Sequence, residues 1–197
     1  MLILSCASNP FLQHQAERFY YQGQSLLSQG RTDEAYEKFD QSFKLSEKAG
    51  HRIGMAHNLN EKAIIYTAKS QYDNARKSLN DAMEIYKDLE MNPEVSKALN
   101  NLALTYLREK RFQEAIKQYD VLLEWDRTTG NRLGAAIVLN QMGWVYASFL
   151  KNPYKAYNMY SDARNIFTEL GKLEHIKVVE KNIDMLLKQV SQPKPRE

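Results

Sequence analysis

Apolar and small residues recur at three- and four-residue spacing through long stretches that contain neither glycine nor proline. This spacing is typical of amphipathic helices, because side chains three and four positions apart share one helix face. Over residues 100–125 the pattern predicts one helix that ends near Glu109 and a second that begins near Phe112. Strand-like alternation is missing, so the pattern predicts an all-α protein.

The helical pattern repeats with a period of about forty residues. The repeat is clearest at four alanines spaced 40, 40 and 41 residues apart, which are Ala35, Ala75, Ala115 and Ala156. Each period holds two helices, so we predict four helix pairs over residues 14–49, 52–89, 93–129 and 132–170, and a capping helix over 172–190. Residues 1–10 are predicted to be a tether or a truncated signal, 11–190 the repeat domain, and 191–197 a disordered tail.

Asparagine and glycine mark the expected helix ends. In Asn92-Pro93 and Asn152-Pro153, an N-cap residue precedes a proline at the first helical position. Glycines are expected in left-handed caps after four of the helices, at Gly30, Gly50, Gly130 and Gly171.

The repeat resembles the tetratricopeptide repeat (TPR) family. The second period carries the resemblance at Ala63, Tyr66, Tyr72, Ala75, Leu79 and Ala82, and the third at Leu102, Ala103, Tyr106, Phe112, Ala115 and Tyr119. A forty-residue period is similar to the long-repeat branch of kinesin light chains, Pins-type adaptors and bacterial Rap-type peptide receptors. The resemblance implies a right-handed superhelix, an α-solenoid of about four TPR helix pairs plus the capping helix. Its first helices would line a concave groove.

Three asparagines on the expected groove face recur forty residues apart, at Asn60, Asn100 and Asn140. A side-chain amide donates and accepts at once, so a ladder of amides can hold an extended peptide backbone. The long-repeat relatives imply this role for asparagines of the inner helix. The alternative is that each asparagine bridges to the next helix of the stack.

An apolar column runs beside this ladder at Ile64, Leu104 and Trp144, and would offer pockets for ligand side chains unless it packs against a neighbouring element. Basic side chains on the same face, at Lys97, Arg108 and Lys181, predict that an acidic segment of the ligand lies towards the C-terminal end. For Lys181 the alternative is the solvated face of a capping helix.

Enzyme and metal chemistry find no support in the sequence. Phosphate-binding loops, dinucleotide fingerprints, H-E-x-x-H and G-x-S-x-G are all missing, and the four histidines share no ligand spacing. The 27 Lys and Arg nearly balance the 24 Asp and Glu, and no basic stripe for nucleic acid is present. We therefore predict no catalytic residues, no metal, no cofactor and no nucleic-acid partner.

The single cysteine, Cys6, follows the apolar run Leu2-Ile3-Leu4 and a serine. This arrangement resembles the lipobox of bacterial lipoproteins, although a signal peptide would need a longer apolar run upstream. The hypothesis is a lipid on Cys6 that tethers the protein to the cell envelope. The alternative is an ordinary cysteine in a cytoplasmic protein.

These observations predict a non-enzymatic scaffold that binds a peptide or protein segment in the concave groove. The alternative is a structural assembly module, in an envelope complex or a homodimer, that uses its convex face or its ends.

Overall fold

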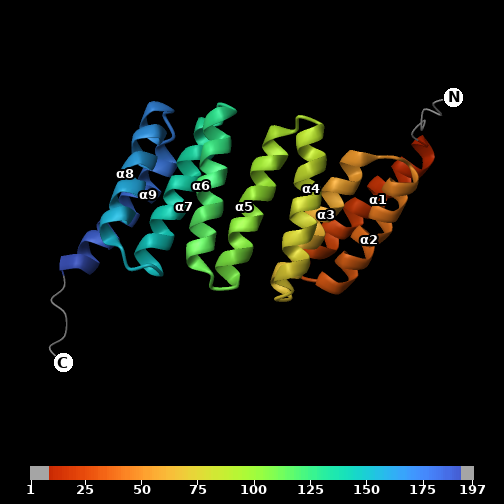
Figure 1. Ribbon diagram of the computed structural model, residues 1–197, viewed down its shortest axis with the longest axis horizontal. Helices are drawn as coiled ribbons and strands as arrows, with labels where there is room; N and C mark the ends of the chain where they lie inside the picture. Colours follow the sequence, from red (N-terminus) through yellow and green to blue (C-terminus); the bar gives the residue numbers. More distant parts are fainter. Residues whose placement is uncertain (1–8, 192–197) are drawn as a thin grey trace. The chain divides into compact units, whose positions relative to one another are not determined.

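The computed structural model describes residues 9–191, which fold into nine α-helices joined by short turns and contain no strand (Figure 1). The all-α prediction is thereby confirmed. The helices fall into two compact units that divide between Glu109 and Lys110. Cys6 lies outside the described residues, as does the predicted tail beyond Ser191.

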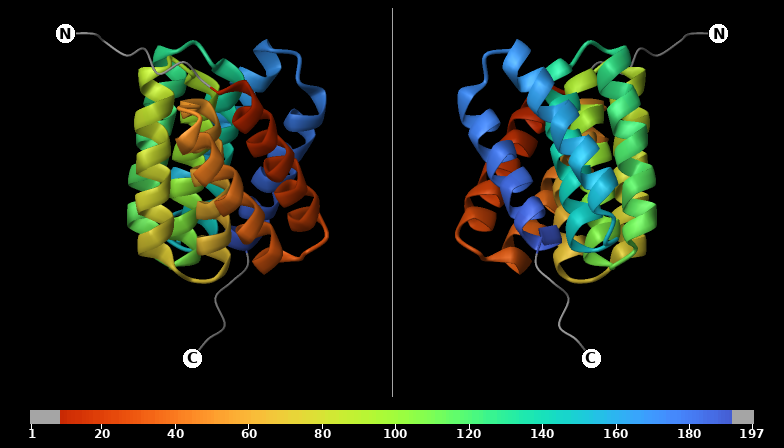
Figure 2. Two further views of the ribbon diagram at one scale, coloured as in Figure 1. Left: turned by 90° about the vertical axis from the view of Figure 1, so that its right-hand side faces the viewer. Right: turned by 90° about the vertical axis from the view of Figure 1, so that its left-hand side faces the viewer.

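The first unit contains five helices. They are α1 (Pro10–Ser28), α2 (Thr32–Lys48), α3 (Arg52–Ala68), α4 (Tyr72–Asp88) and α5 (Asn92–Arg108). Each helix packs against the next one along the chain, and α3 also contacts both α1 and α5. Figure 2 shows α1 and α2 side by side and antiparallel. The first helix of each pair therefore touches the first helix of the next pair within this unit.

The second unit contains four helices. They are α6 (Phe112–Thr128), α7 (Arg132–Ser148), α8 (Pro153–Glu169) and α9 (Leu173–Ser191). Neighbours along the chain pack in the same way, and α7 also contacts α9. Both units thus use the same helix-pair arrangement.

Small residues allow the helices of a pair to approach closely. The four repeated alanines, Ala35, Ala75, Ala115 and Ala156, are fully buried. Where the first helix carries glycine, the facing aromatic ring fills the space directly. A Cβ on Gly23 would stand 2.7 Å from the ring of Phe39, and a Cβ on Gly143 would stand 2.6 Å from that of Tyr160. Close packing at these points leaves no room for a larger side chain.

One left-handed residue follows every helix from α1 to α8, at intervals of twenty or twenty-one residues. These residues are Gly30, Gly50, Ser70, Glu90, Lys110, Gly130, Lys151 and Gly171, with φ between 50° and 75°. The four expected glycine caps are confirmed, and the other four turns adopt the same conformation without glycine. A non-glycine residue in this left-handed conformation lowers the free energy of unfolding by about 1 kcal/mol or more, because its Cβ crowds the backbone.

Of the two helix starts expected at Asn-Pro, one is confirmed and one differs by a residue. The side chain of Asn152 caps α8 and accepts a hydrogen bond from the Lys155 amide at 3.0 Å, as expected. In contrast, Asn92 is the first residue of α5 and Met91 precedes it as the N-cap residue. The expectation for Asn92 was wrong by one position, because the left-handed residue at Glu90 already sets where the next helix begins.

The first helix begins earlier than the repeat pattern indicates. Pro10 is the first residue of α1, and the side chain of Asn9 caps the helix by accepting hydrogen bonds from the amides of Phe11 and Leu12 at 3.1 and 3.3 Å. Proline suits this position because its missing N–H would have no intrahelical partner there. The expected tether of residues 1–10 therefore includes the start of a helix.

Exchanging residues at two equivalent turns should change stability in opposite directions. Glu90→Gly relieves a left-handed non-glycine residue and should raise the free energy of unfolding by about 1 kcal/mol. Gly50→Ala introduces such a residue and should lower it by about the same amount. Urea denaturation followed by circular dichroism measures both changes. Equal effects of the two substitutions would contradict the assignment of these turns.

Candidate functional site

A pocket of about 580 Å³ opens in the first unit between α3 and α5. Both helices contribute side chains from their C-terminal halves, and the α3–α4 turn and the start of α4 add two more. The lining residues are Ile64, Thr67, Ala68, Ser70, Tyr72, Asn101, Leu104 and Arg108. This volume falls within the range of pockets that bind small ligands or single side chains of a partner.

Polar side chains join α3 to α5 at the pocket. The Nδ2 of Asn101 donates a hydrogen bond to the Oδ1 of Asn60 at 3.0 Å. Thr105 donates its hydroxyl to the carbonyl of Asn101 at 2.8 Å, so the 2.9 Å contact between the hydroxyls of Thr67 and Thr105 has Thr67 as its donor. These bonds fix the separation of the two helices and hold Asn101 in place.

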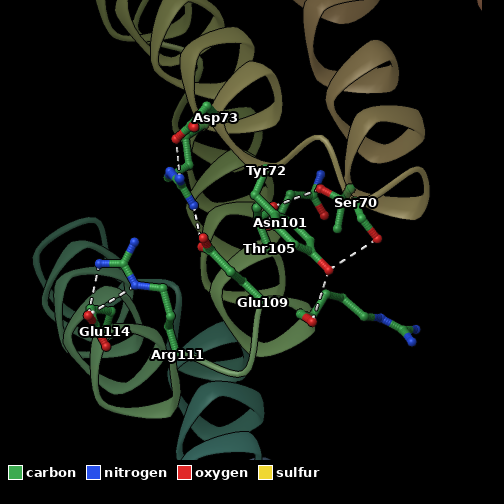
Figure 3. Close-up of polar contacts among 11 residues, drawn as sticks. Ser70, Tyr72, Asp73, Asn101, Thr105, Glu109, Arg111 and Glu114 are labelled. Carbon is green, nitrogen blue, oxygen red and sulfur yellow. Dashed lines mark hydrogen bonds and ion pairs between the residues drawn. The ribbon is translucent and has the colours of Figure 1, made fainter.

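Tyr72, the first residue of α4, forms one end of the pocket. Its hydroxyl lies 3.1 Å from the carbonyl oxygen of Arg108 and 3.3 Å from the Oγ of Ser70, and can donate to either (Figure 3). This bridge fixes the end of α5 against the turn after α3. The guanidinium of Arg108 is exposed at the pocket and makes no hydrogen bond or ion pair within residues 9–191.

The acidic residue next to Arg108 is already paired with another arginine. Glu109 accepts a hydrogen bond from Arg76 at 2.5 Å, and Arg76 also pairs with Asp73, as Figure 3 shows. The Arg76 guanidinium lies over the ring of Tyr106, 5.2 Å from its centroid. Because these contacts hold the Glu109 carboxylate, the positive charge of Arg108 stays available to a ligand.

Two aliphatic side chains supply the apolar part of the pocket. Ile64 of α3 is half-buried, and Leu104 of α5 is 38% exposed. Both line the same pocket. Their position beside Asn101 and Arg108 combines apolar contact area with hydrogen-bonding groups.

The asparagine ladder has a different arrangement from the expected one. Asn60 is only 2% exposed and accepts the bond from Asn101. Asn140 of α7 likewise accepts from the Nδ2 of Asn182 on α9 at 3.0 Å. Asn100 is half-buried and makes no side-chain hydrogen bond within residues 9–191. For Asn60 and Asn140 the structure thus shows the alternative, in which each asparagine bridges to a neighbouring inner helix.

Lys97 lies one turn before Asn101 on α5. Its side chain is largely exposed, and its Nζ lies 3.4 Å from the Oε1 of the buried Glu61. Glu61 also faces the hydroxyl of Tyr20 at 3.5 Å. Burial, together with the negative charge of Glu61, raises the pKa of Tyr20, so this phenol stays protonated. Lys97 therefore offsets a buried carboxylate and is not an unpaired cation.

The remaining expected contacts lie in the second unit. Trp144 of α7 is 47% exposed and meets Phe149 edge-on, with 4.9 Å between ring centroids. Phe149 in turn stacks on Phe112 at 4.3 Å. Lys181 is exposed on α9, beside Asn182 in the sequence. This unit therefore carries an aromatic cluster of its own at Trp144, Phe149 and Phe112.

Of the residues predicted from the sequence, Ile64, Leu104 and Arg108 share one pocket, whereas Asn101 and Tyr72 were missed as its lining. The signal for Asn101 was present. Residues 97, 101, 104 and 108 follow the spacing of four, three and four positions that forms one helix stripe. The forty-residue recurrence of asparagine instead directed attention to position 100.

Two further findings concern the described part of the chain. Residues 9–191 contain no group of three or more His, Cys, Asp or Glu side chains placed to hold a metal ion. Among their helices, none has the length and apolar character needed to cross a bilayer.

Comparison with protein families gives a match over most of the chain. Residues 15–88 and 94–169 match the model described as Tetratricopeptide repeat. The chain belongs to the tetratricopeptide repeat family. The resemblance predicted from the repeat residues is therefore confirmed. A curated relative of this TPR protein is the photosystem I assembly protein Ycf3 of Synechococcus sp. (strain CC9311), which is 30% identical over 128 residues, 64% of this chain and 68% of the relative.

Solved structures with the same fold include aspartyl phosphate phosphatase F from Bacillus subtilis, with a TM-score of 0.80 and 14% identity over 89% of this TPR chain and 46% of that one. A Rap protein complexed with competence and sporulation factor matches with a TM-score of 0.62 and 19% identity, over 86% and 50% of the two chains. The TPR-like repeats described as kinesin light chain from Podosopora anserina match with a TM-score of 0.66 and 15% identity, over 90% and 93%. The chain spans about half the length of the first two proteins, and identities this low show the fold alone.

The buried bond between Asn60 and Asn101 leads to a stability prediction. Asn60→Ala removes the acceptor of Asn101 and should lower the free energy of unfolding by about 1 to 3 kcal/mol. Asn100→Ala is the matched control in the neighbouring helix and should change it by less than about 0.5 kcal/mol. Urea denaturation of the three proteins measures the difference. Equal losses for both variants would show that the bond does not hold α3 to α5.

Proposed function

We propose that this TPR protein is a non-catalytic scaffold that binds an extended segment of a protein partner in the pocket between α3 and α5. The observation that carries the proposal is the combination of an apolar pair with an unpaired guanidinium and a positioned amide in one pocket. Apolar anchors surrounded by orienting polar groups are typical of peptide-binding sites.

The pocket defines what the bound segment should present. An apolar side chain would lie between Ile64 and Leu104. Asn101 uses its Nδ2 to donate to Asn60, and its Oδ1 makes no hydrogen bond within residues 9–191. This oxygen can therefore accept from a peptide N–H. Arg108 would bind a carbonyl or carboxylate next to that side chain. The preferred ligand is therefore an apolar residue adjacent to an acidic residue.

The comparisons support a protein or peptide as the partner. The family and the fold favour protein–protein interaction, and the Rap protein of similar fold was solved with competence and sporulation factor bound. The related Ycf3 is named as an assembly protein. The residues that line the pocket include no histidine and no carboxylate, the side chains that most often act as general acids and bases. This chemistry supports binding rather than catalysis.

In the second unit we propose further contacts with the partner through Trp144 and Lys181. Trp144 leaves nearly half of its surface exposed although its edge contacts Phe149, so it offers apolar area for contact. Lys181 supplies positive charge on α9. Asn140 would act indirectly, by fixing α7 to α9 through Asn182.

A second candidate function is assembly through exposed apolar side chains of α9. Five apolar side chains of this helix are at least half exposed, namely Leu173, Val178, Met185, Leu187 and Val190. These exposed apolar side chains favour association with another protein or a second copy of the chain.

Attachment to the cell envelope through a lipid on Cys6 stays a prediction, and a cytoplasmic location is its alternative. The residue lies outside the described part of the chain. Metabolic labelling with an alkyne fatty acid, compared between the natural sequence and Cys6→Ser, tests it directly.

Charge introduced at the pocket should abolish capture of the partner. We expect Leu104→Glu and Arg108→Glu each to remove the specific partners seen with the unchanged protein in a pull-down analysed by mass spectrometry. The matched controls place the same residue on exposed positions elsewhere, as Val121→Glu on α6 and Lys77→Glu on α4, and should retain those partners. Capture that survives both pocket substitutions would reject the pocket and favour assembly through α9.

A further inference from the structure

A second recess, of about 300 Å³, lies in the first unit among α1, α2 and the N-terminal half of α3. Its lining shares no residue with the pocket between α3 and α5. The lining residues are Glu17, Tyr20, Tyr21, Ser42, Ser46, His51, Ile53, Gly54, His57 and Asn58. Three of them, Ser46, His51 and Asn58, carry a buried polar atom without a hydrogen-bond partner.

The orientation of the Asn58 amide is fixed by its neighbours. Ser42 donates its hydroxyl to the carbonyl of Ala16 at 2.7 Å, so its oxygen can only accept from Asn58. The Nδ2 of Asn58 therefore donates to Ser42 at 2.9 Å and to the carbonyl of Gly54 at 2.7 Å. Both amide protons are used. The Oδ1 of Asn58, in a side chain 1% exposed, is left as an acceptor that needs a donor.

The other two atoms lie close together beside Gly54. A Cβ on Gly54 would stand 2.6 Å from both the Oγ of Ser46 and the Nδ1 of His51, so only the absence of a side chain at position 54 lets these two atoms lie there. Ser46 is 1% exposed. A hydroxyl oxygen accepts hydrogen bonds, and so does the Nδ1 of a neutral imidazole whose proton is on Nε2. The recess thus holds one fixed acceptor, the Oδ1 of Asn58, and two further atoms that can accept, all three without a hydrogen-bond partner.

The second unit also carries polar side chains at the equivalent positions, but there they have hydrogen-bond partners within the protein. Eighty residues after Ser46, His51 and Gly54 stand Asp126, Asn131 and Gly134. There Asn131 donates to Asp126 at 2.9 Å and accepts from the Gly134 amide at 3.1 Å, so the side chains satisfy one another.

At the positions forty and eighty residues after Ser42 and Asn58, this polar pair is replaced by a pair of apolar side chains. These are Ala82 with Ala98, and Leu122 with Val138, all buried. A buried polar group without a partner is costly, and the same backbone is built without it elsewhere. The polar set in the first unit is therefore an addition that a ligand would explain.

The walls of the recess are suited to a positive charge. Glu17 is its one acidic lining residue, and no lysine or arginine lines it. Tyr20 contacts both Tyr21 and His57 ring to ring, at centroid distances of 5.7 and 6.0 Å. Burial lowers the pKa of His57, so its imidazole is neutral at physiological pH. Aromatic faces beside a carboxylate are a favourable environment for a cation.

We propose that this recess binds a primary ammonium group. An ammonium carries one positive charge and three N–H donors, which match Asn58 Oδ1, Ser46 Oγ and His51 Nδ1. Glu17 and the ring of Tyr20 would stabilise the charge. A lysine side chain of a protein and a free amine share this chemistry. The proposal does not depend on peptide binding between α3 and α5.

The first test compares probes on the unchanged protein by 1H–15N NMR, in phosphate buffer at pH 7.5 and constant ionic strength. n-Butylammonium should shift the amide signal of Gly54 and the side-chain amide signals of Asn58. Butyltrimethylammonium keeps the charge but has no N–H donor, and should bind at least about tenfold more weakly. Similar affinity for the two probes, or no shift with n-butylammonium, would overturn the proposal and leave the acceptors to bound water.

A second arm separates the two sources of the ammonium. The peptide acetyl-Gly-Lys-Gly-amide is compared with the norleucine peptide, which lacks the charged group, and with n-butylammonium. Tighter binding of the lysine peptide than of the free amine would assign the recess to a lysine of a partner, and the reverse would assign it to a free amine. Equal binding of the lysine and norleucine peptides would contradict the proposal.

A pair of matched variants locates the site. Gly54→Ala places a methyl group between Ser46 and His51 and should weaken n-butylammonium binding at least about tenfold, while alanine favours the helix. Gly134→Ala makes the same change at the equivalent position of the second unit and should leave binding unchanged. The double variant Ser42→Ala with Asn58→Ala introduces the alanines that stand at the equivalent positions, Ala82 and Ala98. It should abolish binding while the helix content is retained. Unchanged affinity in Gly54→Ala would reject the recess as the site.

Discussion

The close approach of paired helices at small residues is the constraint on which each unit depends. Four buried alanines at the repeat position, with Gly23 and Gly143 against aromatic rings, bring the backbones within reach of one another. The packed helices are joined by short turns of one repeated geometry. The left-handed residue that follows each helix from α1 to α8 provides that geometry, even where Glu90 or Lys110 must adopt it at a cost.

This packing places the inner helices of a unit side by side, so polar side chains can bond across them. Asn60 with Asn101, and Asn140 with Asn182, are bonds of the same kind in different units. In each bond the accepting asparagine joins two helices and holds the donating asparagine at a defined position. In the first unit the donating asparagine is Asn101, which lies in the pocket beside Leu104. The structural bond and the candidate binding site are thus parts of one arrangement.

The helix pairs and their turns were predictable, because the repeated alanines and the glycine caps can be recognised directly in the sequence. The pocket was predictable only in part. Ile64, Leu104 and Arg108 follow from the helix stripe, whereas the burial of Asn60 depends on which residue of the next helix faces it. The division between Glu109 and Lys110 has no counterpart in the regular repeat. The open acceptor at Asn58 depends on hydrogen bonds between helices, from Asn58 to Ser42 and from Ser42 to Ala16, that no spacing encodes.

Site-specific photo-crosslinking tests the central claim most directly, because it reports contact at a chosen residue in the folded protein. A benzophenone amino acid would replace Leu104 at the pocket and, as the matched control, Val121 on α6, which is similarly exposed. Mass spectrometry then identifies the crosslinked segment. The account predicts that position 104 captures a peptide segment of one partner, with an apolar residue next to an acidic one, and that position 121 does not. Crosslinking of that partner at position 121 but not at 104 would contradict it.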